Sequence, residues 1–522
     1  MIQGRCALEP VEHIGNVVSR ICAKGVRLWS ENGRLHYESP RGVLTQEEFD
    51  RLKTSKAEIV ALLEGARVNS VSAPPLERRR LSEAAPLSYQ QLAHWNLYEL
   101  QCRPAIRQMA AAETLCGNLD LEALRSSLRE VVNRHEVLRT RFAICEGTPM
   151  QEILESVDCR IDVEDLTALP GSDRDLVIAN RIDELILEPI DVSVAPLLGA
   201  RVLKIGPDEH VLIVVMEHMI SDAYSMNVFL RDLFETYLQT RAGRVVSLPR
   251  IPVQFADFAL WQRKARNWWN ERFGSAWKRR FGELGRLRFP EDEHAQAAAR
   301  RGWGHVSVRI DSDLKKELRN WCRSKGTTLV MTVFTAYAAL VLRWCNASCA
   351  AFQFQIDGRF DRRLENTMGY FACALYLRID LSREDDFVDL LRQIMEEYYK
   401  AYERVDGSYL ESRVPRPQLS RNCAFNWVPQ QAGIELTNRE VAQHGITCAP
   451  YSFDHPMLKT LERDNEPVML LYDGDQEVIG GVQFPLNRFS VEMMERFVRN
   501  FSMFLQLLVR QPATRVDQVL LG

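Results

Sequence analysis

The run Val211-Leu-Ile-Val-Val-Met216 limits the fold of this chain more than any other segment. It is wholly apolar and rich in β-branched residues, and it is too short for a core helix. A strand of this kind is buried on both faces, which places it inside a sheet that helices cover on both sides. Residues 226–238 then show apolar residues at helical spacing, so the sequence predicts a layered α/β fold.

A second set of alternating elements follows in the C-terminal half. Leu329–Leu342 is apolar over 14 residues, with two Thr and a Tyr among them. A membrane span needs roughly 20 apolar residues, so a buried helix that ends near Trp344 is the better interpretation. Strands are expected at residues 351–356 and 374–379.

The halves are separated by a polar stretch rich in Arg and Trp, residues 262–301. We therefore expect two lobes of similar size, residues 86–265 and residues 266–522 with the linking helix.

The first 65 residues predict a separate small α+β unit. Residues 11–23 have helical spacing, and Asn32-Gly33 between two alternating runs is the strongest local signal for a hairpin over residues 26–38. Thr45 and Glu48 form a capping box that opens a helix running to about Leu63. So small a unit is more plausible as a binding module than as an enzyme.

Residues 66–85 are polar and contain prolines, and they have no apolar period, so they are interpreted as a linker. The run Glu77-Arg-Arg-Arg80 within them is expected to be a solvated set of charges.

The composition excludes several classes of protein. Of the 522 residues, 66 are Lys or Arg and 70 are Asp or Glu, and this balance argues against a nucleic-acid binder. The 12 cysteines are scattered and form no CxxC, which is typical of reduced thiols in the cytosol. Neither a signal peptide, nor a zinc pattern, nor a phosphate-binding glycine loop is recognisable, so a cytoplasmic chain without metal or membrane is expected.

One histidine stands where sites are commonly built. His218 follows the apolar strand directly, and Asp222 comes four residues later. A carboxylate near an imidazole can fix its tautomer, or it can pair with a distant Arg and hold the loop. This spacing alone is a weak pattern and also occurs in structural histidines.

Six segments, in this order, resemble the motifs of nonribosomal peptide synthetase condensation domains. They include Arg-His-Glu-Val-Leu-Arg-Thr-Arg-Phe and Glu-His-Met-Ile-Ser-Asp-Ala, where the family has His-His-x-x-x-Asp-Gly. The segments are 87–100, 134–142, 217–223, 255–262, 368–378 and 425–427. The N-terminal unit is similar to the TubC-like β-hairpin docking domains that precede some condensation domains, through Gly25-Val-Arg-Leu-Trp29, residues 39–45 and Lys56-Ala-Glu-Ile59.

The resemblance implies two chloramphenicol-acetyltransferase-like lobes in a V with a central tunnel. It implies a free-standing condensation enzyme, because neither an adenylation domain nor a carrier protein fits in the remaining residues. Its activity would be acyl transfer from a carrier-bound thioester to an amine or a hydroxyl. The 4′-phosphopantetheine arms would come from partner carrier proteins, and no cofactor would be bound.

By the same resemblance, His218 accepts or positions the proton of the attacking group. Asp222 would be structural and would pair with Arg134 or Arg139, although surface ion pairing is an equal alternative for both arginines. The sequence departs from the family motif at Glu217, which replaces the first His, and at Ala223, which replaces Gly and removes freedom for positive φ.

Further candidates follow from the same resemblance. Those expected along the tunnel are Ser221, Ala223, Trp261 and Asn426. Those expected to bind the C-terminal tail of an upstream carrier protein at the hairpin are Arg27, Trp29, Arg34 and Arg41. A heterocyclising relative would have Asp in place of the first His, and the other motifs here do not fit that subgroup.

Two other functions stay open. Glu217 and Ala223 could mark a catalytically degenerate domain that only recruits carriers. A coenzyme A-dependent acyltransferase could share the HxxxD pattern, although a diffusing thioester needs no docking unit. The sequence leaves open the donor acyl chain, an amide or ester product, and a carrier-bound or free acceptor; the chain is expected to be a monomer.

Overall fold

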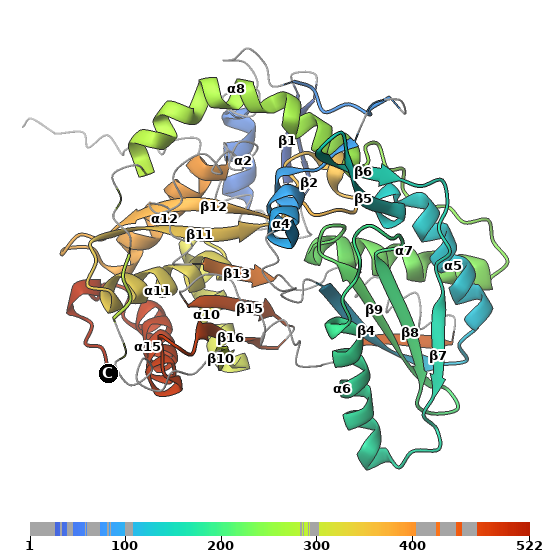
Figure 1. The fold of residues 1–522 in the computed structure, drawn as a ribbon. Coiled ribbons are helices and arrows are strands. Elements are labelled where there is room, and N and C mark those ends of the chain that lie inside the picture. Colours follow the sequence, from blue (N-terminus) through green and yellow to red (C-terminus); the bar gives the residue numbers. More distant parts are fainter. Residues whose placement is uncertain are drawn as a thin grey trace, which may run out of the picture.

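The computed structural model describes most of the chain. The described residues are 27–31, 34–38, 45–57, 59, 74–80, 83, 85–99, 108–281, 284, 287–290, 292, 302–402, 424–428, 445–451, 467–474 and 476–522. Two lobes, each with its own sheet, lie side by side (Figure 1).

The N-terminal lobe is built on a five-stranded sheet with β9 (Glu209–Glu217) at its centre. Alternate residues of β9 point to opposite faces: Leu212 and Val214 pack with helices α5 and α7, and Val211 and Ile213 pack with α6. The predicted central strand with both faces covered is thus confirmed. The other elements are β4 (Gln108–Gly117), β8 (Leu198–Lys204), β7 (Ile161–Asp165), α5 (Leu121–Arg134), α6 (Gly171–Leu187) and α7 (Ala223–Arg241).

A smaller sheet and one helix complete this lobe. The sheet has the order β3-β6-β5. The helix α4 lies close to the second lobe (Figure 1). These elements are β3 (Ala85–Pro86), β6 (Thr148–Ile153), β5 (Thr140–Cys145), α4 (Tyr89–Glu99) and the short helix η1 (Glu136–Arg139).

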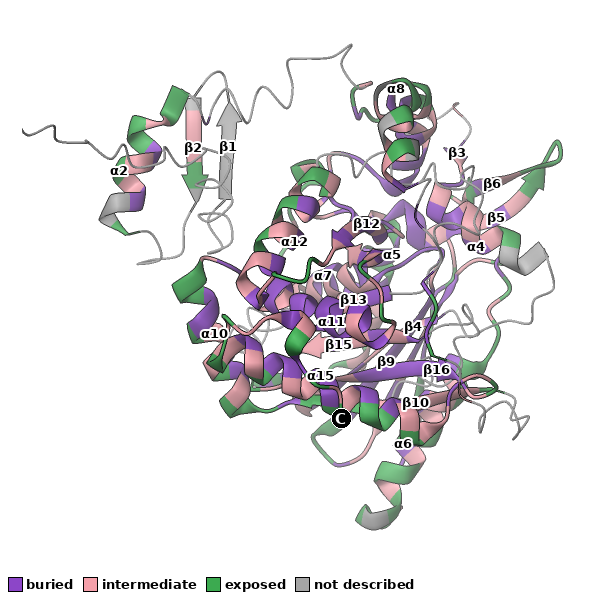
Figure 2. Cartoon of the chain, turned by 90° about the vertical axis from the view of Figure 1, so that its left-hand side faces the viewer, coloured by how far each residue is buried: buried purple, intermediate pink, exposed green. Residues whose placement is uncertain are grey.

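The C-terminal lobe has a six-stranded sheet of order β10-β16-β15-β13-β11-β12. Its helix α11 (Leu329–Trp344) is buried almost along its whole length, as Figure 2 shows, and the predicted buried helix is therefore confirmed. The strands are β10 (Trp303–Ile310), β11 (Cys349–Ile356), β12 (Cys373–Asp380), β13 (Ala424–Val428), β15 (Val468–Asp473) and β16 (Val478–Pro485). The other helices are α10 (Ser312–Lys325), α12 (Phe387–Tyr402), α15 (Val491–Arg510), η2 (Arg362–Leu364) and η4 (Val516–Gln518).

Two elements join the lobes, and both correct the expected boundary between residues 265 and 266. The linking helix α8 (Phe255–Phe281) includes the eleven residues before that boundary. Strand β14 (Ile446–Pro450) comes from the C-terminal half but pairs with β4, because β4 is an edge strand that otherwise has an open side. The N-terminal sheet therefore includes a strand from residues 266–522.

The N-terminal unit contains the predicted hairpin and helix. Strands β1 (Arg27–Glu31) and β2 (Arg34–Glu38) pair so that Glu31 lies opposite Arg34. Helix α2 (Gln46–Thr54) has the predicted capping box, because Glu48 N donates to Thr45 Oγ1 at 3.2 Å and Thr45 N donates to Glu48 Oε2 at 3.0 Å. α2 ends at Thr54, a turn at Ser55 follows, and residues 56, 57 and 59 are again helical; residues 60–63 and the predicted helix at 11–23 lie outside the described residues.

Most of the charge run in the segment interpreted as a linker is solvated as expected, because Glu77, Arg78 and Arg80 are exposed, but its middle arginine is not. Leu76 is buried, and the Arg79 side chain is only 6% exposed between Glu136 and Asp257, at 3.1 and 3.4 Å. For Arg79 alone the expectation of a solvated charge is wrong, because two buried carboxylates, remote in sequence, pair with it.

Within the described part of the chain, no single helix is long and apolar enough to cross a membrane; α10 and α11 reach that threshold only together, across a bend of 102°.

Candidate active site

His218 is the first residue after β9, and its ring is held from one side. Its Nδ1 lies 2.8 Å from the carbonyl oxygen of Ser221. A carbonyl only accepts, so Nδ1 carries the proton and Nε2 of the neutral ring has the lone pair. This arrangement presents a proton acceptor at Nε2.

The turn that carries His218 is compact. Ile220 N donates to Glu217 O at 3.0 Å, and Asp222 caps α7 by accepting from Ser225 N at 2.7 Å. Ala223 is the first residue of α7, and it is not among the described residues with positive φ. The turn therefore does not need the glycine that the family motif has at this position.

Asp222 connects the two lobes. Its carboxylate receives Arg359 Nη1 and Nη2 at 3.2 and 3.3 Å, and the backbone N–H groups of Phe371 and Ala372 at 2.9 and 3.0 Å. Both charged side chains are only 2% exposed. Arg359 also donates to Ser225 Oγ at 2.8 Å, so residues 357–372 of the C-terminal lobe are fixed to the start of α7.

The expected pairing of Asp222 with Arg134 or Arg139 is therefore wrong. Arg134 Nε donates to Asp232 at 2.9 Å, and Arg139 donates to the carbonyl of Leu154. Burial acts to raise the pKa of Asp232, but His135 and Arg231 outweigh it and lower that pKa to about 2. Arg134 and Arg139 therefore make their contacts within the N-terminal lobe and not with Asp222.

Two rings that the sequence analysis did not single out lie against His218. Their centroid distances to the His218 ring are 5.2 Å for His94, from α4, and 4.3 Å for Tyr370, from the segment between β11 and β12. The Tyr370 hydroxyl is 3.3 Å from His94 Nε2. One local feature could have indicated that His94 faces the site: it lies on the same helical face as Gln90 and Gln91, which are four and three residues earlier.

The remaining candidates are distributed differently from the expectation. Ser221 is fully buried and contributes its carbonyl to His218, while its hydroxyl bonds to the Asp222 carbonyl at 3.3 Å. Trp261 packs on Phe258, and its Nε1 donates to Pro74 O at 2.6 Å. Neither side chain is available to line a tunnel, because each is enclosed by packing.

Glu217 and Asn426 are both on strands near the lobe junction. Glu217 ends β9, is 2% exposed and lies opposite Gln108 of β4. Asn426 lies on β13, and its buried Oδ1 has no hydrogen-bond partner among the residues that the structure describes. A buried amide oxygen without a partner is costly to the fold, so Asn426 remains a candidate contact for a substrate.

The docking candidates are only partly described. The structure describes the backbone of Arg27, Trp29 and Arg34 in the hairpin strands, but not their side chains. Arg41 is outside the described residues.

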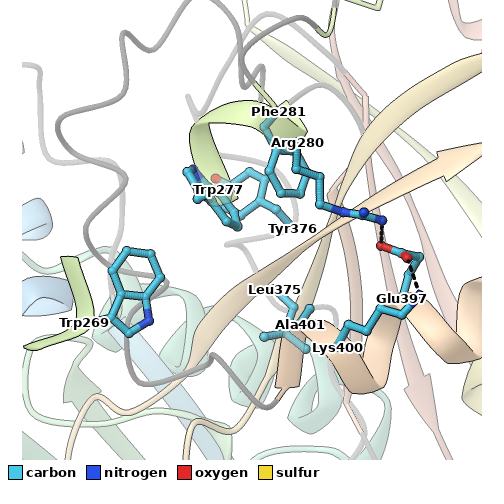
Figure 3. A pocket seen from close by; sticks show the side chains of 9 residues that line it. All are labelled: Trp269, Trp277, Arg280, Phe281, Leu375, Tyr376, Glu397, Lys400 and Ala401. Atoms are coloured by element: carbon cyan, nitrogen blue, oxygen red, sulfur yellow. Dashed lines mark hydrogen bonds and ion pairs between the residues drawn. The ribbon is translucent and has the colours of Figure 1, made fainter. Parts of the chain in front are cut away.

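No metal cluster accompanies the site. Among the residues that the structure describes, no group of three or more His, Cys, Asp or Glu side chains could hold a metal ion. One hollow of about 380 Å³, including space open to solvent, lies between α8 and α12 (Figure 3). Trp269, Trp277 and Tyr376 line it, and Arg280 and Lys400 pair there with Glu397, so it contains none of the site candidates.

The chain resembles known proteins over most of its length. Residues 82–521 match the condensation domain family, and residues 14–64 match the TubC N-terminal docking domain. Chondramide synthase of Chondromyces crocatus is 27% identical over 84% of this chain, and the chain spans 11% of that synthase. Gramicidin S synthase 2 of Brevibacillus brevis is 26% identical over 77% of this chain, which spans 9% of it.

Solved structures share the fold. In the complex of the X-domain and OxyB from teicoplanin biosynthesis, one chain matches with a TM-score of 0.70 at 22% identity, over 87% of this chain and 99% of that chain. The EpoB cyclization-docking bidomain from Sorangium cellulosum matches with a TM-score of 0.65 at 19% identity, over 96% and 98% of the two chains. At these identities the likeness shows the fold, and it confirms the two-lobed α/β architecture.

Proposed function

The chain belongs to the condensation-domain family, and from this premise we propose that it transfers a carrier-bound acyl group to an amine or hydroxyl acceptor. The observation that carries the proposal is the distance of 2.8 Å between His218 Nδ1 and the Ser221 carbonyl oxygen, because a carbonyl acceptor requires the proton on Nδ1. In that tautomer Nε2 carries the lone pair, and it is the atom proposed to accept the proton of the attacking group.

The proposed step balances without a covalent enzyme intermediate. The acceptor nitrogen or oxygen attacks the thioester carbonyl, its proton passes to His218 Nε2, and the new C–N or C–O bond replaces the C–S bond. The protonated imidazole can then return the proton to the departing thiolate. Holding both reactants in one site makes the attack effectively unimolecular, which supplies much of the rate.

Asp222 supports this step from a distance. Its carboxylate is fully engaged with Arg359, the N-terminus of α7 and the backbone of residues 371–372. We therefore assign it the task of holding the two lobes together.

The hairpin unit is proposed to recruit the upstream carrier protein in trans. In the described residues β1 and β2 pair only with each other, so the hairpin offers an edge to which an extended peptide could add as a strand. Tyr37 packs edge-on against Phe49 of α2, with ring centroids 5.8 Å apart, which holds the hairpin to the helix. A C-terminal tail of the carrier is the proposed ligand.

A test for the docking role is deletion of residues 1–65. Transfer from a carrier with its tail should weaken through a higher Michaelis constant, while transfer from a small soluble thioester should not change. Equal binding of a synthetic tail peptide by the truncated and full-length chains, measured by calorimetry, would reject the docking role.

A binding-only role is the second candidate. Its specific support is the buried Glu217 in place of the motif's first histidine, together with the fold likeness to an X-domain solved in complex with OxyB. Such a domain would bind its partner without forming a bond.

Intact-protein mass spectrometry of single-turnover transfer separates the two functions. An acylated carrier is mixed with the chain and candidate acceptors, and an acyl-coenzyme A donor is run in parallel. Loss of acyl mass from the carrier with appearance of an amide or ester supports catalysis. Binding without transfer for every acceptor favours the second candidate.

A further inference from the structure

Three aromatic rings from three distant parts of the chain form one cluster at the lobe junction, which we call the ring cluster: His94, His218 and Tyr370. The centroid distances are 5.2 Å for His94–His218, 4.3 Å for His218–Tyr370 and 4.9 Å for His94–Tyr370. The His94 ring stands at 88° to the His218 ring, and the Tyr370 ring is tilted by 43° to it. The base proposed for transfer is therefore in contact with a ring from each of two other segments.

Helix α4 is fixed to both lobes by neighbours of His94. Gln91 Nε2 donates to the Met219 carbonyl at 2.9 Å, one residue beyond His218. Gln90 Nε2 donates to the Phe371 carbonyl at 3.2 Å, one residue beyond Tyr370. His94 lies one turn later on the helix and is 3% exposed, so its place between the two segments is set by the backbone around it.

The hydrogen bond from His218 Nδ1 to Ser221 does not by itself fix the imidazole. A single bond sets the tautomer but leaves the ring able to tilt about the N–H···O axis. Rings packed at these distances restrict that tilt, since an interior at normal density leaves no room for it. Tyr370 is itself held, because its hydroxyl lies 3.3 Å from His94 Nε2.

We propose that His94 and Tyr370 are positioning residues for His218: Tyr370 covers the face of the imidazole, and His94 holds Tyr370 through its hydroxyl. The catalytic part of this inference rests on the proposed acyl transfer, whereas the part about ring orientation does not. A polar side chain is required at position 94 because an aliphatic side chain could fill the space but could not bind the hydroxyl.

Four single variants separate the ring contact from the hydrogen bond. Tyr370→Leu removes the ring, and we expect kcat to fall by about 10²-fold with KM within about threefold, the effect of a small misplacement of the reacting group. Tyr370→Phe and His94→Leu each keep the bulk but remove the bond, and each should lower kcat by about tenfold. His94→Gln keeps a polar atom near Nε2 and should stay within about threefold of wild type. Tyr451→Phe, outside the ring cluster, is the matched control.

The double variant Tyr370→Phe/His94→Leu tests whether the two residues act through one bond. If they do, the double variant is no slower than the slower single variant, because the bond is already lost. Multiplied losses of about 10²-fold would show independent roles and overturn the proposal.

Ring mobility is measured without any turnover. In protein with ¹³C- and ¹⁵N-labelled histidine rings, assigned with His218→Gln, wild-type His218 should show one neutral tautomer, with the proton on Nδ1, and high order parameters for its ring C–H bonds. In Tyr370→Leu the tautomer should stay the same, because the bond to Ser221 sets it, while the order parameters should fall as the ring tilts. Unchanged order parameters and unchanged kcat in the folded variants would refute the positioning role. If wild type transfers no acyl group, the proposed function fails, and the order parameters still decide whether the two rings hold His218.

Discussion

Replacing Asp222 with alanine tests the junction of the two lobes most directly. The Asp222 carboxylate accepts five hydrogen bonds, from Ser225 N, from both terminal nitrogens of Arg359 and from the N–H groups of Phe371 and Ala372. Alanine removes all five and leaves the guanidinium of Arg359 buried without its carboxylate.

The expected loss follows from these contacts. Removing one partner of a buried ion pair costs about 3–5 kcal/mol, and losing an N-cap costs about 1 kcal/mol. The two costs overlap, and Arg359 keeps Ser225 Oγ and the carbonyls of Asp357 and Thr367 as acceptors. We therefore expect a loss of about 4 kcal/mol in the free energy of unfolding.

Urea unfolding followed by tryptophan fluorescence measures the loss, with each transition midpoint recorded because two lobes need not unfold in one step. The matched control is Asp361→Ala, which breaks the pair with Arg363, whose side chains are 27% and 46% exposed. This partly exposed pair should contribute about 1 kcal/mol or less, and because Asp361 also caps the three-residue helix η2, Asp361→Ala should cost about 1–2 kcal/mol in all. An Asp222→Ala protein that unfolds with the wild-type midpoint, or no earlier than Asp361→Ala, would refute the reasoning.

Three further outcomes are expected. His218→Ala should stay folded and lose transfer by about 10²-fold or more, because it lacks the proton acceptor; wild-type turnover in single-turnover assays would contradict this. Burial raises the pKa of Glu113 to about 7, and Cys448 donates to its carboxylate at 3.3 Å. The pKa of Glu113 in the folded protein is above its value in the unfolded chain, so folding favours the neutral carboxyl. The stability that Glu113 contributes is therefore fully present below about pH 4.5 and is lost as the pH rises through 7. Glu113→Gln should thus gain up to about 3 kcal/mol relative to wild type between pH 5 and pH 8, and equal melting shifts at both pH values would count against it. Arg79→Met should lower the melting temperature by several degrees, unlike Arg78→Met at the more exposed neighbour, because it leaves Glu136 and Asp257 without their buried cation.

Sequence patterns predicted the elements whose structure depends on residues close together in the sequence. The apolar run of β9 required cover on both faces, and the side chains of α5, α6 and α7 supply it. The capping box of Thr45 and Glu48 needs only residues three positions apart, and it is present in the structure.

The contacts that sequence patterns missed depend on chain topology. Arg359 is 137 residues from Asp222, and nothing in its own segment marks it as the partner of that carboxylate. Strand β14 pairs with β4 across 329 or more positions, and no local pattern shows which sheet a strand joins. Arg79 looked solvated because its neighbours are charged, while its partners come from η1 and α8.

The lobe junction and the ring cluster share one segment, and this couples stability to the arrangement of the site. Tyr370 stands immediately before Phe371, whose N–H is held by Asp222, and immediately after Gly369, whose N–H is held by Ser225. Loosening the junction in Asp222→Ala therefore frees the residues that place Tyr370 against His218. We expect the folded fraction of that variant, at a temperature well below its midpoint, to show a lower kcat than wild type and the lowered order parameters of the His218 ring that Tyr370→Leu should also show. A full wild-type kcat in folded Asp222→Ala would separate the junction from the ring cluster and contradict this coupling.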